Sequence, residues 1–187
     1  MSFVSRAGLK LDHALTAFGL DVSGRTCADL GSNAGGFVDC LLQRGAARVY
    51  AIDTGYGALD WKLRNDPRVV VMERTNAMHA SLPEKVGLVT IDVAWTRQRY
   101  ILPAARRMVG DAGDVVTLIK PHYEADAAQL RGGVLPEEVV ESIVRAVRLD
   151  IAAAGLELIA LVTSPIKGAK GNVEVLAHLR PRSPLPA

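Results

Sequence analysis

The sequence contains few cysteines, no long apolar run and almost no net charge. With only Cys27 and Cys40, it lacks the disulfide framework of a small secreted protein, and we expect both residues to be buried thiols. No run approaches the roughly 20 apolar residues that span a bilayer, and the N-terminal segment lacks the apolar core and cleavage site of a secretory signal. These absences predict a cytoplasmic protein that is neither exported nor held in a membrane.

The charge balance is close to neutral, with 22 Lys and Arg against 20 Asp and Glu and a pI of about 8.6. Such a chain attracts polyanions only weakly as a whole, so any affinity for nucleic acid must come from local clusters of basic residues. Hydrophobic residues make up 49% of the 187 residues, which suits one folded domain. We expect a single domain over residues 1–187, with a disordered proline-rich tail from residue 180.

Short apolar strands alternate with helical patterns along most of the chain. The last two strands are joined by a glycine-containing loop that is too short for a crossover helix, so they should pair antiparallel. The pattern predicts a Rossmann-like α/β fold, in which a seven-stranded, mostly parallel sheet with one antiparallel strand has helices on both faces. The expected strands are 26–30, 48–52, 68–72, 86–91, 114–119, 156–163 and 172–179, and the main helices are 6–18, 37–44, 99–108 and 136–154.

A glycine-rich loop, GSNAGG, follows the first expected strand. Its spacing differs from the dinucleotide pattern G-x-G-x-x-G, and no Lys-Ser or Lys-Thr pair follows, which argues against a phosphate-binding P-loop. Asp53 ends the next strand, where an acidic side chain can bind ribose hydroxyls, although a tight turn with Asp53 as a helix cap is the alternative. Because strand ends share one edge of a parallel sheet, we expect a nucleoside-containing ligand there. The candidate binding residues are Asp29, Gly31, Ser32, Gly35, Gly36, Phe37, Asp53, Glu73, Asn76 and Asp92.

Several contiguous stretches resemble the methyltransferase domain of the TlyA-type hemolysin A proteins, within the FtsJ-like ribosomal RNA methyltransferases. They include VSRAGLKLDHAL, DLGSNAGGFVDCLLQRG, LIKPHYEA and SPIKGAKGNVEVL, and the resemblance covers nearly the whole chain. It implies the class I methyltransferase fold, S-adenosylmethionine as the cofactor, no metal, and methylation of a ribose 2′-hydroxyl in ribosomal RNA.

The family's Lys-Asp-Lys-Glu tetrad has a matching position for each member, at Lys10, Asp92, Lys120 and Glu174. Methyl transfer to a ribose hydroxyl requires removal of its proton, and a lysine with the ordinary pKa near 10.4 is a poor base. Burial beside a second cation lowers the pKa of a lysine. By this resemblance Lys120 would receive the proton, Asp92 and Lys10 would position it, and Glu174 would orient the set, although Lys10 is an alternative base. Taken singly, each residue could equally be a surface or capping residue.

Two departures from the family pattern bear on RNA binding. Ala94 and Trp95 stand where the family has a Ser-Phe pair, and the family's Pro-Gln-Phe-Glu stretch has His122 and Tyr123 in its middle. These two side chains could offer a polar edge and an aromatic face to a splayed base, or Tyr123 could be a core residue. The family also carries a small N-terminal RNA-binding module, and we expect this chain to lack it because it begins almost at VSRAGLKL.

RNA is therefore the expected partner, with two alternatives. Basic residues that could contact phosphates are Arg6, Arg74, Arg97, Arg99, Lys167 and Lys170. The chain could instead methylate a small molecule, or it could bind the cofactor without catalysis and act on membranes, as the name hemolysin suggests. The sequence shows no amphipathic membrane helix in support of lysis, and an intact tetrad would have no use in a mere binder.

Overall fold

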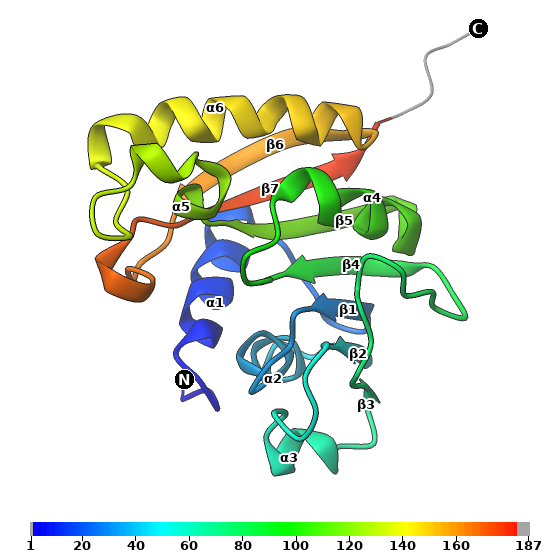
Figure 1. The fold of residues 1–187 in the computed structure, drawn as a ribbon. Coiled ribbons are helices and arrows are strands. Elements are labelled where there is room, and N and C mark those ends of the chain that lie inside the picture. The colour runs from blue at the N-terminus through cyan, green and yellow to red at the C-terminus, as the bar shows by residue number, and fades with distance from the viewer. Residues whose placement is uncertain (1, 183–187) are drawn as a thin grey trace, which may run out of the picture.

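A single seven-stranded sheet organises the computed structural model, which describes residues 2–182 (Figure 1). The strand order is β3-β2-β1-β4-β5-β7-β6. From β1 the chain builds the sheet outward first on one side, through β2 and β3, and then on the other, beginning with β4. β7 pairs antiparallel with β5 and β6, whereas the other neighbours are parallel, so the predicted mixed sheet is confirmed. The strands are β1 (Thr26–Leu30), β2 (Arg48–Ile52), β3 (Val69–Met72), β4 (Val86–Ile91), β5 (Val109–Ile119), β6 (Leu156–Thr163) and β7 (Val175–Pro181).

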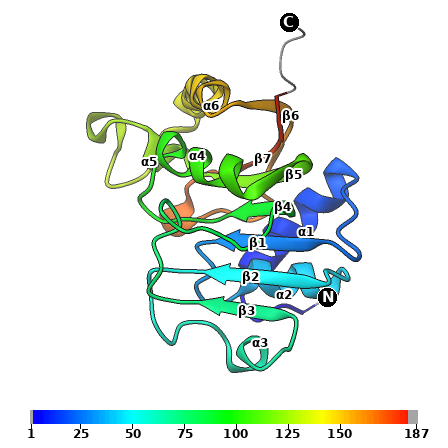
Figure 2. The same ribbon diagram turned by 90° about the vertical axis from the view of Figure 1, so that its right-hand side faces the viewer.

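Helices cover both faces of this sheet, as Figure 2 shows from the side. Successive side chains of a strand point to opposite faces, so Cys27 of β1 joins one hydrophobic cluster and Ala28 joins the other. The first cluster receives α1 (Ala7–Phe18) and α2 (Gly36–Gln43), and the second receives α4 (Gln98–Met108) and α6 (Glu137–Ala153). Burial raises the pKa of the Cys27 and Cys40 thiols to about 12, and both are free, as predicted.

The remaining elements are short and lie in the loops. They are α3 (Trp61–Arg64), α5 (Pro121–Glu124), and the 3-10 turns η1 (Ala127–Gln129) and η2 (Ala169–Gly171). Among residues 2–182, no helix is both long and apolar enough to cross a membrane.

Three predicted strand boundaries are wrong by two residues or more, namely the start of β5 and both ends of the last strand. The last strand was predicted over 172–179, but β7 begins at Val175 because Asn172 still caps η2. β5 begins at Val109 instead of residue 114, because a register irregularity between Val86 and Leu88 of β4 lets the partner strand include extra residues. The tail was expected from residue 180, but β7 continues to Pro181, whose neighbour Arg180 pairs with Glu157 of β6. Residues 183–187 of that predicted tail lie outside the described part of the chain.

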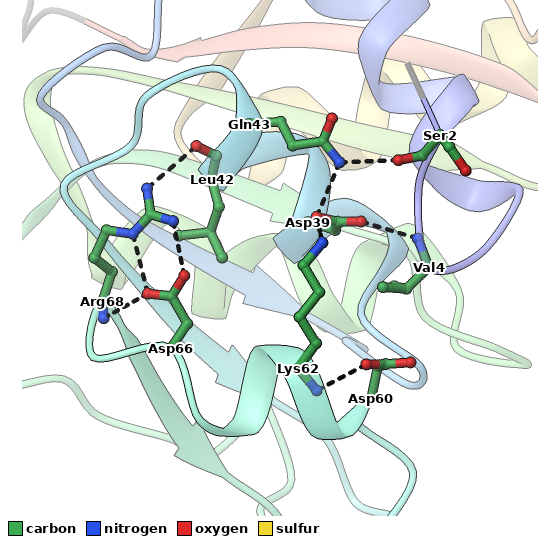
Figure 3. A network of polar contacts seen from close by, with 9 residues as sticks. All are labelled: Ser2, Val4, Asp39, Leu42, Gln43, Asp60, Lys62, Asp66 and Arg68. Atoms are coloured by element: carbon green, nitrogen blue, oxygen red, sulfur yellow. Dashed lines mark hydrogen bonds and ion pairs between the residues drawn. The ribbon is translucent and has the colours of Figure 1, made fainter.

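The segment before α1 is tied to α2 by a buried carboxylate (Figure 3). Asp39 is 2% exposed, and its Oδ2 accepts a hydrogen bond from the Val4 backbone N–H at 2.9 Å. Gln43 Nε2 donates to Asp39 Oδ1 and to the Ser2 carbonyl, each at 3.0 Å. The Lys62 ammonium approaches Asp39 Oδ1 at 3.4 Å from the solvent side. These contacts fix the path of residues 2–5 toward the edge of the sheet where the strands end.

Candidate active site

Two cavities adjoin at the carboxyl ends of β1 and β4, where the strand order reverses and open α/β sheets bind their ligands. One has a volume of about 330 Å³ and the other of about 200 Å³. Both are lined by Gly31, Asn33, Asp92 and Ala94, so they form one continuous crevice. The predicted ligand-binding edge therefore carries a cleft.

The glycine-rich loop packs so closely that side chains would not fit. A Cβ on Gly31 would lie 2.5 Å from the Asp92 carbonyl oxygen, and the Gly31 φ of +89° favours glycine. A Cβ on Gly36 would collide with Ser5 Oγ and Ala7. Gly36, Ser32 and Phe37 line the smaller cavity, while Gly35, the N-cap of α2, has a φ of +96° and lines neither cavity.

Asp53 and Asn76 both line the larger cavity. The carboxylate of Asp53 accepts hydrogen bonds from the backbone N–H groups of Asn33 at 2.9 Å and Gly55 at 2.7 Å, which hold it at the end of β2. Asn76 Oδ1 accepts a hydrogen bond from the Met78 N–H at 3.0 Å. Asn76 therefore stabilises a turn and also lines the larger cavity.

Glu73, predicted as a ligand-binding residue, is not brought into either cavity. Its Oε1 accepts from the Gly57 N–H at 2.9 Å and pairs with the Arg64 guanidinium, which lowers the pKa of Glu73. The expectation fails because the strand-end carboxylate has turned toward α3, where it braces the loop that follows Asp53.

Asp29 lines the smaller cavity and carries a buried acceptor that has no partner. Its Oδ1 accepts from Thr90 Oγ1 at 2.7 Å, whereas Oδ2 is buried without a partner. Burial, reinforced by the Asp92 and Asp53 carboxylates, raises the pKa of Asp29 to about 7. A buried orphan carboxylate oxygen indicates a missing ligand group. The methionine ammonium of S-adenosylmethionine fits this position chemically, because it is a cationic donor.

The four tetrad positions form two ion pairs. Lys10 of α1 and Glu174, just before β7, join at 2.5 Å between Nζ and Oε2, with side chains 9% and 3% exposed. Lys120 Nζ lies 2.7 Å from Asp92 Oδ1 and donates to the Val93 carbonyl at 3.1 Å. Lys120 and Asp92 line the smaller cavity. Lys10 and Glu174, which are 164 positions apart in the chain, thus meet in the fold, although neither lines the crevice. Lys120 meets Asp92 at the strand ends, in the wall of the smaller cavity.

The neighbours of the tetrad differ in exposure. We expected His122 to offer a polar edge to a splayed base, but only 7% of the residue is exposed. Tyr123 is half-buried. The Tyr123 ring lies 6.4 Å from that of Trp95, centroid to centroid. Trp95 is 82% exposed, has a left-handed φ of +54° and lines the larger cavity. Sequence reasoning noted Trp95 only as a departure from the family, although an aromatic residue just after a strand-end acid was the available signal.

Several predicted phosphate contacts already have partners within the chain. Lys167 pairs with Glu137 at 2.9 Å, Arg97 with Asp126 at 3.5 Å, and Lys170 Nζ donates to the Gly132 carbonyl. The Arg74 guanidinium stacks over the Tyr56 ring at 4.2 Å, and that of Arg99 over the Tyr100 ring at 4.8 Å. These basic groups thus have partners within the chain, but the exposed ion pairs of Lys167 and Arg97 contribute little stability and could be exchanged for phosphate contacts.

Residues 3–180 match the family model of the FtsJ-like methyltransferases. The 16S/23S rRNA (cytidine-2′-O)-methyltransferase TlyA of Mycobacterium tuberculosis is 42% identical over 185 residues, covering 96% of this chain and 69% of that protein. Hemolysin A of Brachyspira hyodysenteriae is 39% identical, covering 95% and 77%. The chain spans about two thirds to three quarters of the length of the relatives it matches.

Solved structures agree with this assignment. One from Streptococcus thermophilus is 38% identical with a TM-score of 0.93, over all of this chain and 71% of the other. An S-adenosylmethionine-dependent methyltransferase from Mesorhizobium loti, 15% identical over 90% and 96% of the two chains with a TM-score of 0.66, shares the class I fold alone. The chain belongs to the FtsJ-like methyltransferase family, and membership implies S-adenosylmethionine as its cofactor.

Proposed function

We propose that this protein transfers a methyl group from S-adenosylmethionine to the 2′-hydroxyl of a cytidine ribose in ribosomal RNA, which it would meet in the cytoplasm. The observation that carries the proposal is the Lys120–Asp92 ion pair in the wall of a crevice that is also lined by Asp29, whose buried Oδ2 has no partner. The other two tetrad residues, Lys10 and Glu174, form a second buried ion pair. The choice of substrate rests on the Mycobacterium tuberculosis relative.

The crevice offers a suitable partner for each part of the cofactor, which supplies an electrophilic methyl group when bound. Asp29 Oδ2 would accept from the methionine ammonium. Asp53 would bind the ribose hydroxyls and Asn76 the adenine or its ribose, since both line the larger cavity. Ser32, Gly36 and Phe37 would enclose the methionine chain in the smaller one.

Lys120 is our candidate for the base that removes the proton from the ribose hydroxyl. It lines the smaller cavity, and Asp92 Oδ1 and the Val93 carbonyl fix its amine. The Lys10–Glu174 pair lies deeper and would orient the set without exchanging protons with solvent. A positioned general base contributes about 10²- to 10⁴-fold to a rate, so Lys120 should account for most of the turnover.

RNA would approach the exposed aromatic side of the crevice. Trp95 presents most of its ring to solvent beside Tyr123, and bases stack on such surfaces. Arg74 and Arg99, whose guanidinium groups each lie over an aromatic ring, would contact phosphates there. Arg6, which precedes α1, lies next to Ser5 and Ala7 of the smaller cavity.

Transfer of tritiated methyl groups to ribosomal subunits tests the function. We expect transfer by the native chain, loss of about 10³-fold in Lys120→Ala because the base is gone, and cofactor affinity within about threefold of native. Lys62→Ala, which removes an exposed lysine on α3, is the matched control and should keep full activity. Undiminished transfer by Lys120→Ala would refute the mechanism. Cofactor binding without transfer to any RNA would instead favour a small-molecule methyltransferase or a non-catalytic binder.

A further inference from the structure

A fully buried threonine lies behind the carboxylate of the crevice that has an oxygen without a partner. Thr90 of β4 is 0% exposed and is the register partner of Asp29 on the neighbouring strand β1. Its Oγ1 donates a hydrogen bond to Asp29 Oδ1 at 2.7 Å. Thr90 lines neither cavity, so it can affect a ligand only through Asp29, which lines the smaller one.

The hydroxyl of Thr90 occupies one oxygen of Asp29 and leaves the other open. A hydroxyl has a single proton to donate. The Ala28 carbonyl oxygen lies 3.5 Å from Thr90 Oγ1, which is long for an O–H···O hydrogen bond, so the hydroxyl donates to Asp29 Oδ1. Asp29 Oδ2 stays buried without a partner. Because the strand register fixes both backbones, this contact sets how the carboxylate is turned.

An ammonium group is bound best by an acceptor that is already oriented and charged. We propose that Thr90 is a positioning residue for the cofactor, whose hydroxyl holds Asp29 Oδ1 so that Oδ2 receives the methionine ammonium. This inference rests on the proposed function, in which Asp29 is the acceptor of that ammonium. Removal of the hydroxyl should therefore weaken the binding of ligands that carry the ammonium and spare ligands that lack it.

The electrostatics of Asp29 act in the same direction as the geometry. Burial raises the pKa of Asp29 to about 7, the hydrogen bond from Thr90 lowers it, and the carboxylates of Asp92 and Asp53 raise it. Lys120, the cation that lines the same cavity, is paired with Asp92 at 2.7 Å. Without the Thr90 hydroxyl, the buried carboxylate would turn or take up a proton, and either change removes the oriented anion that an ammonium needs.

Three thioethers with the same adenosine isolate the ammonium group. S-adenosylhomocysteine carries an ammonium and a carboxylate, its decarboxylated form S-adenosyl-3-thiopropylamine carries the ammonium alone, and 5′-methylthioadenosine carries neither. Calorimetric titration of each ligand into the full chain at pH 7.5 or so gives the Kd values. In Thr90→Val, which keeps the branched shape and loses the hydroxyl, we expect the Kd of both amines to rise by about tenfold and that of methylthioadenosine to stay within about twofold of native.

Two further variants separate the hydroxyl from packing. Thr90→Ser keeps the donor and should bind all three ligands within about twofold of native. Thr117→Val makes the same substitution on the adjacent strand β5, at a residue that is also 0% exposed. Because Thr117 Oγ1 donates to Gln98 Oε1 at 2.8 Å and neither residue lines the crevice, this matched control should leave all three Kd values unchanged.

The outcomes separate the inference from the function beneath it. Equal weakening of all three ligands in Thr90→Val, a loss confined to S-adenosylhomocysteine, or a Thr90→Ser variant as weak as the valine variant would overturn the role of the hydroxyl, as would native Kd values in Thr90→Val. If none of the three ligands binds the native protein, the proposed function itself fails. Thr90→Ala is a second variant without the donor and gives the same comparison, should the valine variant not fold.

Discussion

The protein buries two clusters of charge in one sheet, and they differ in how completely their polar atoms are satisfied. In the first, Asp114 of β5 is surrounded by Arg25, His178 and Arg180, with contacts of 2.7, 2.7 and 2.9 Å to its carboxylate oxygens. The second is the candidate active site at the opposite ends of the strands. Within residues 2–182, the buried side-chain atoms without partners are two, Asp29 Oδ2 and His122 Nδ1, and both belong to the second cluster.

This difference separates a structural network from a site prepared for a ligand. A buried polar group without a partner costs about 1–3 kcal/mol of stability. We therefore expect every buried polar atom of a purely structural cluster to have a hydrogen-bond partner. The Asp114 cluster joins the beginning of β1 to β5 and β7, and it is complete. The active-site cluster keeps two buried polar atoms without partners, and one of them belongs to Asp29, which lines the smaller cavity.

The largest expected effect comes from Asp114→Asn, which removes the shared anion of the complete cluster. Because two arginines would lose their counter-ion and His178 its carboxylate partner, we expect the free energy of unfolding to fall by about 3–5 kcal/mol. Urea denaturation measures this. Cofactor affinity of the folded fraction should remain within about twofold of native, since the cluster has no place in the crevice. A large loss of affinity without loss of stability would contradict our division of the molecule.

Acid should remove the difference in the free energy of unfolding between the native protein and Asp114→Asn. Burial raises the pKa of Asp114, but the hydrogen bonds with His178, Arg25 and Arg180 outweigh it and hold the pKa well below its ordinary value of 3.8. A lowered folded-state pKa contributes stability that is complete above the unfolded value and is lost as the pH falls through the folded value. The gap in stability between native and Asp114→Asn should therefore be constant near neutrality and begin to narrow below about pH 3.8.

Asp29→Asn should have the opposite effect on stability. Burial raises the pKa of Asp29 to about 7, so between the unfolded value of 3.8 and 7 the native state holds the proton more tightly and stability falls as the pH rises. The amide lacks this charge and should stabilise the free protein at pH 8 by on the order of 2 kcal/mol, with little effect at pH 4.

The same substitution should weaken binding of S-adenosylmethionine by about tenfold or more, because the ammonium loses a charged acceptor. Thermal denaturation with and without cofactor measures both effects on one sample. Unchanged affinity would show that Oδ2 is not a cofactor contact, and a destabilised variant at pH 8 would show that the buried carboxylate is not under strain.

Features set by local sequence pattern could be predicted from the sequence, whereas features that depend on partners distant in the chain could not. β1, β2 and β4 match the predicted ranges to the residue, because each is an apolar run that ends at a polar residue or a glycine. The start of β5 was missed, since a register irregularity depends on the partner strand and not on local pattern. The tetrad positions were found by their resemblance to a family motif, whereas their pairing, Lys10 with Glu174 and Lys120 with Asp92, appears only in the fold.

Side-chain partners distant in sequence set the remaining limit. Glu73 carries the same strand-end signal as Asp53, yet its partner Arg64 turns it away from the crevice. The Asp114 cluster joins residues up to 89 positions apart, and a lone aspartate at a strand start gives no sign of them. Local patterns thus located the cleft and three of the acids that line it, Asp29, Asp53 and Asp92, but they did not show that Glu73 turns away from it.

The smallest expected effect concerns Asp39, a buried carboxylate whose two oxygens both have hydrogen-bond partners. It holds the backbone of Val4, and the same segment brings Ser5 and Ala7 to the smaller cavity. We expect Asp39→Ala to weaken cofactor binding by about three- to tenfold by loosening this wall, with methyl transfer at saturating cofactor nearly native.

Lys62→Ala is the matched control, since it removes the exposed cation that faces the same carboxylate at 3.4 Å and leaves the Val4 and Gln43 hydrogen bonds in place. Its cofactor Kd, measured by calorimetry, should equal the native value because exposed ion pairs contribute little. Equal losses in Asp39→Ala and Lys62→Ala would mean that charge at this position matters. A loss confined to Asp39→Ala would mean that the hydrogen bonds to the N-terminal segment shape the crevice. A carboxylate with all its hydrogen-bond partners would then support cofactor binding by positioning Ser5 and Ala7.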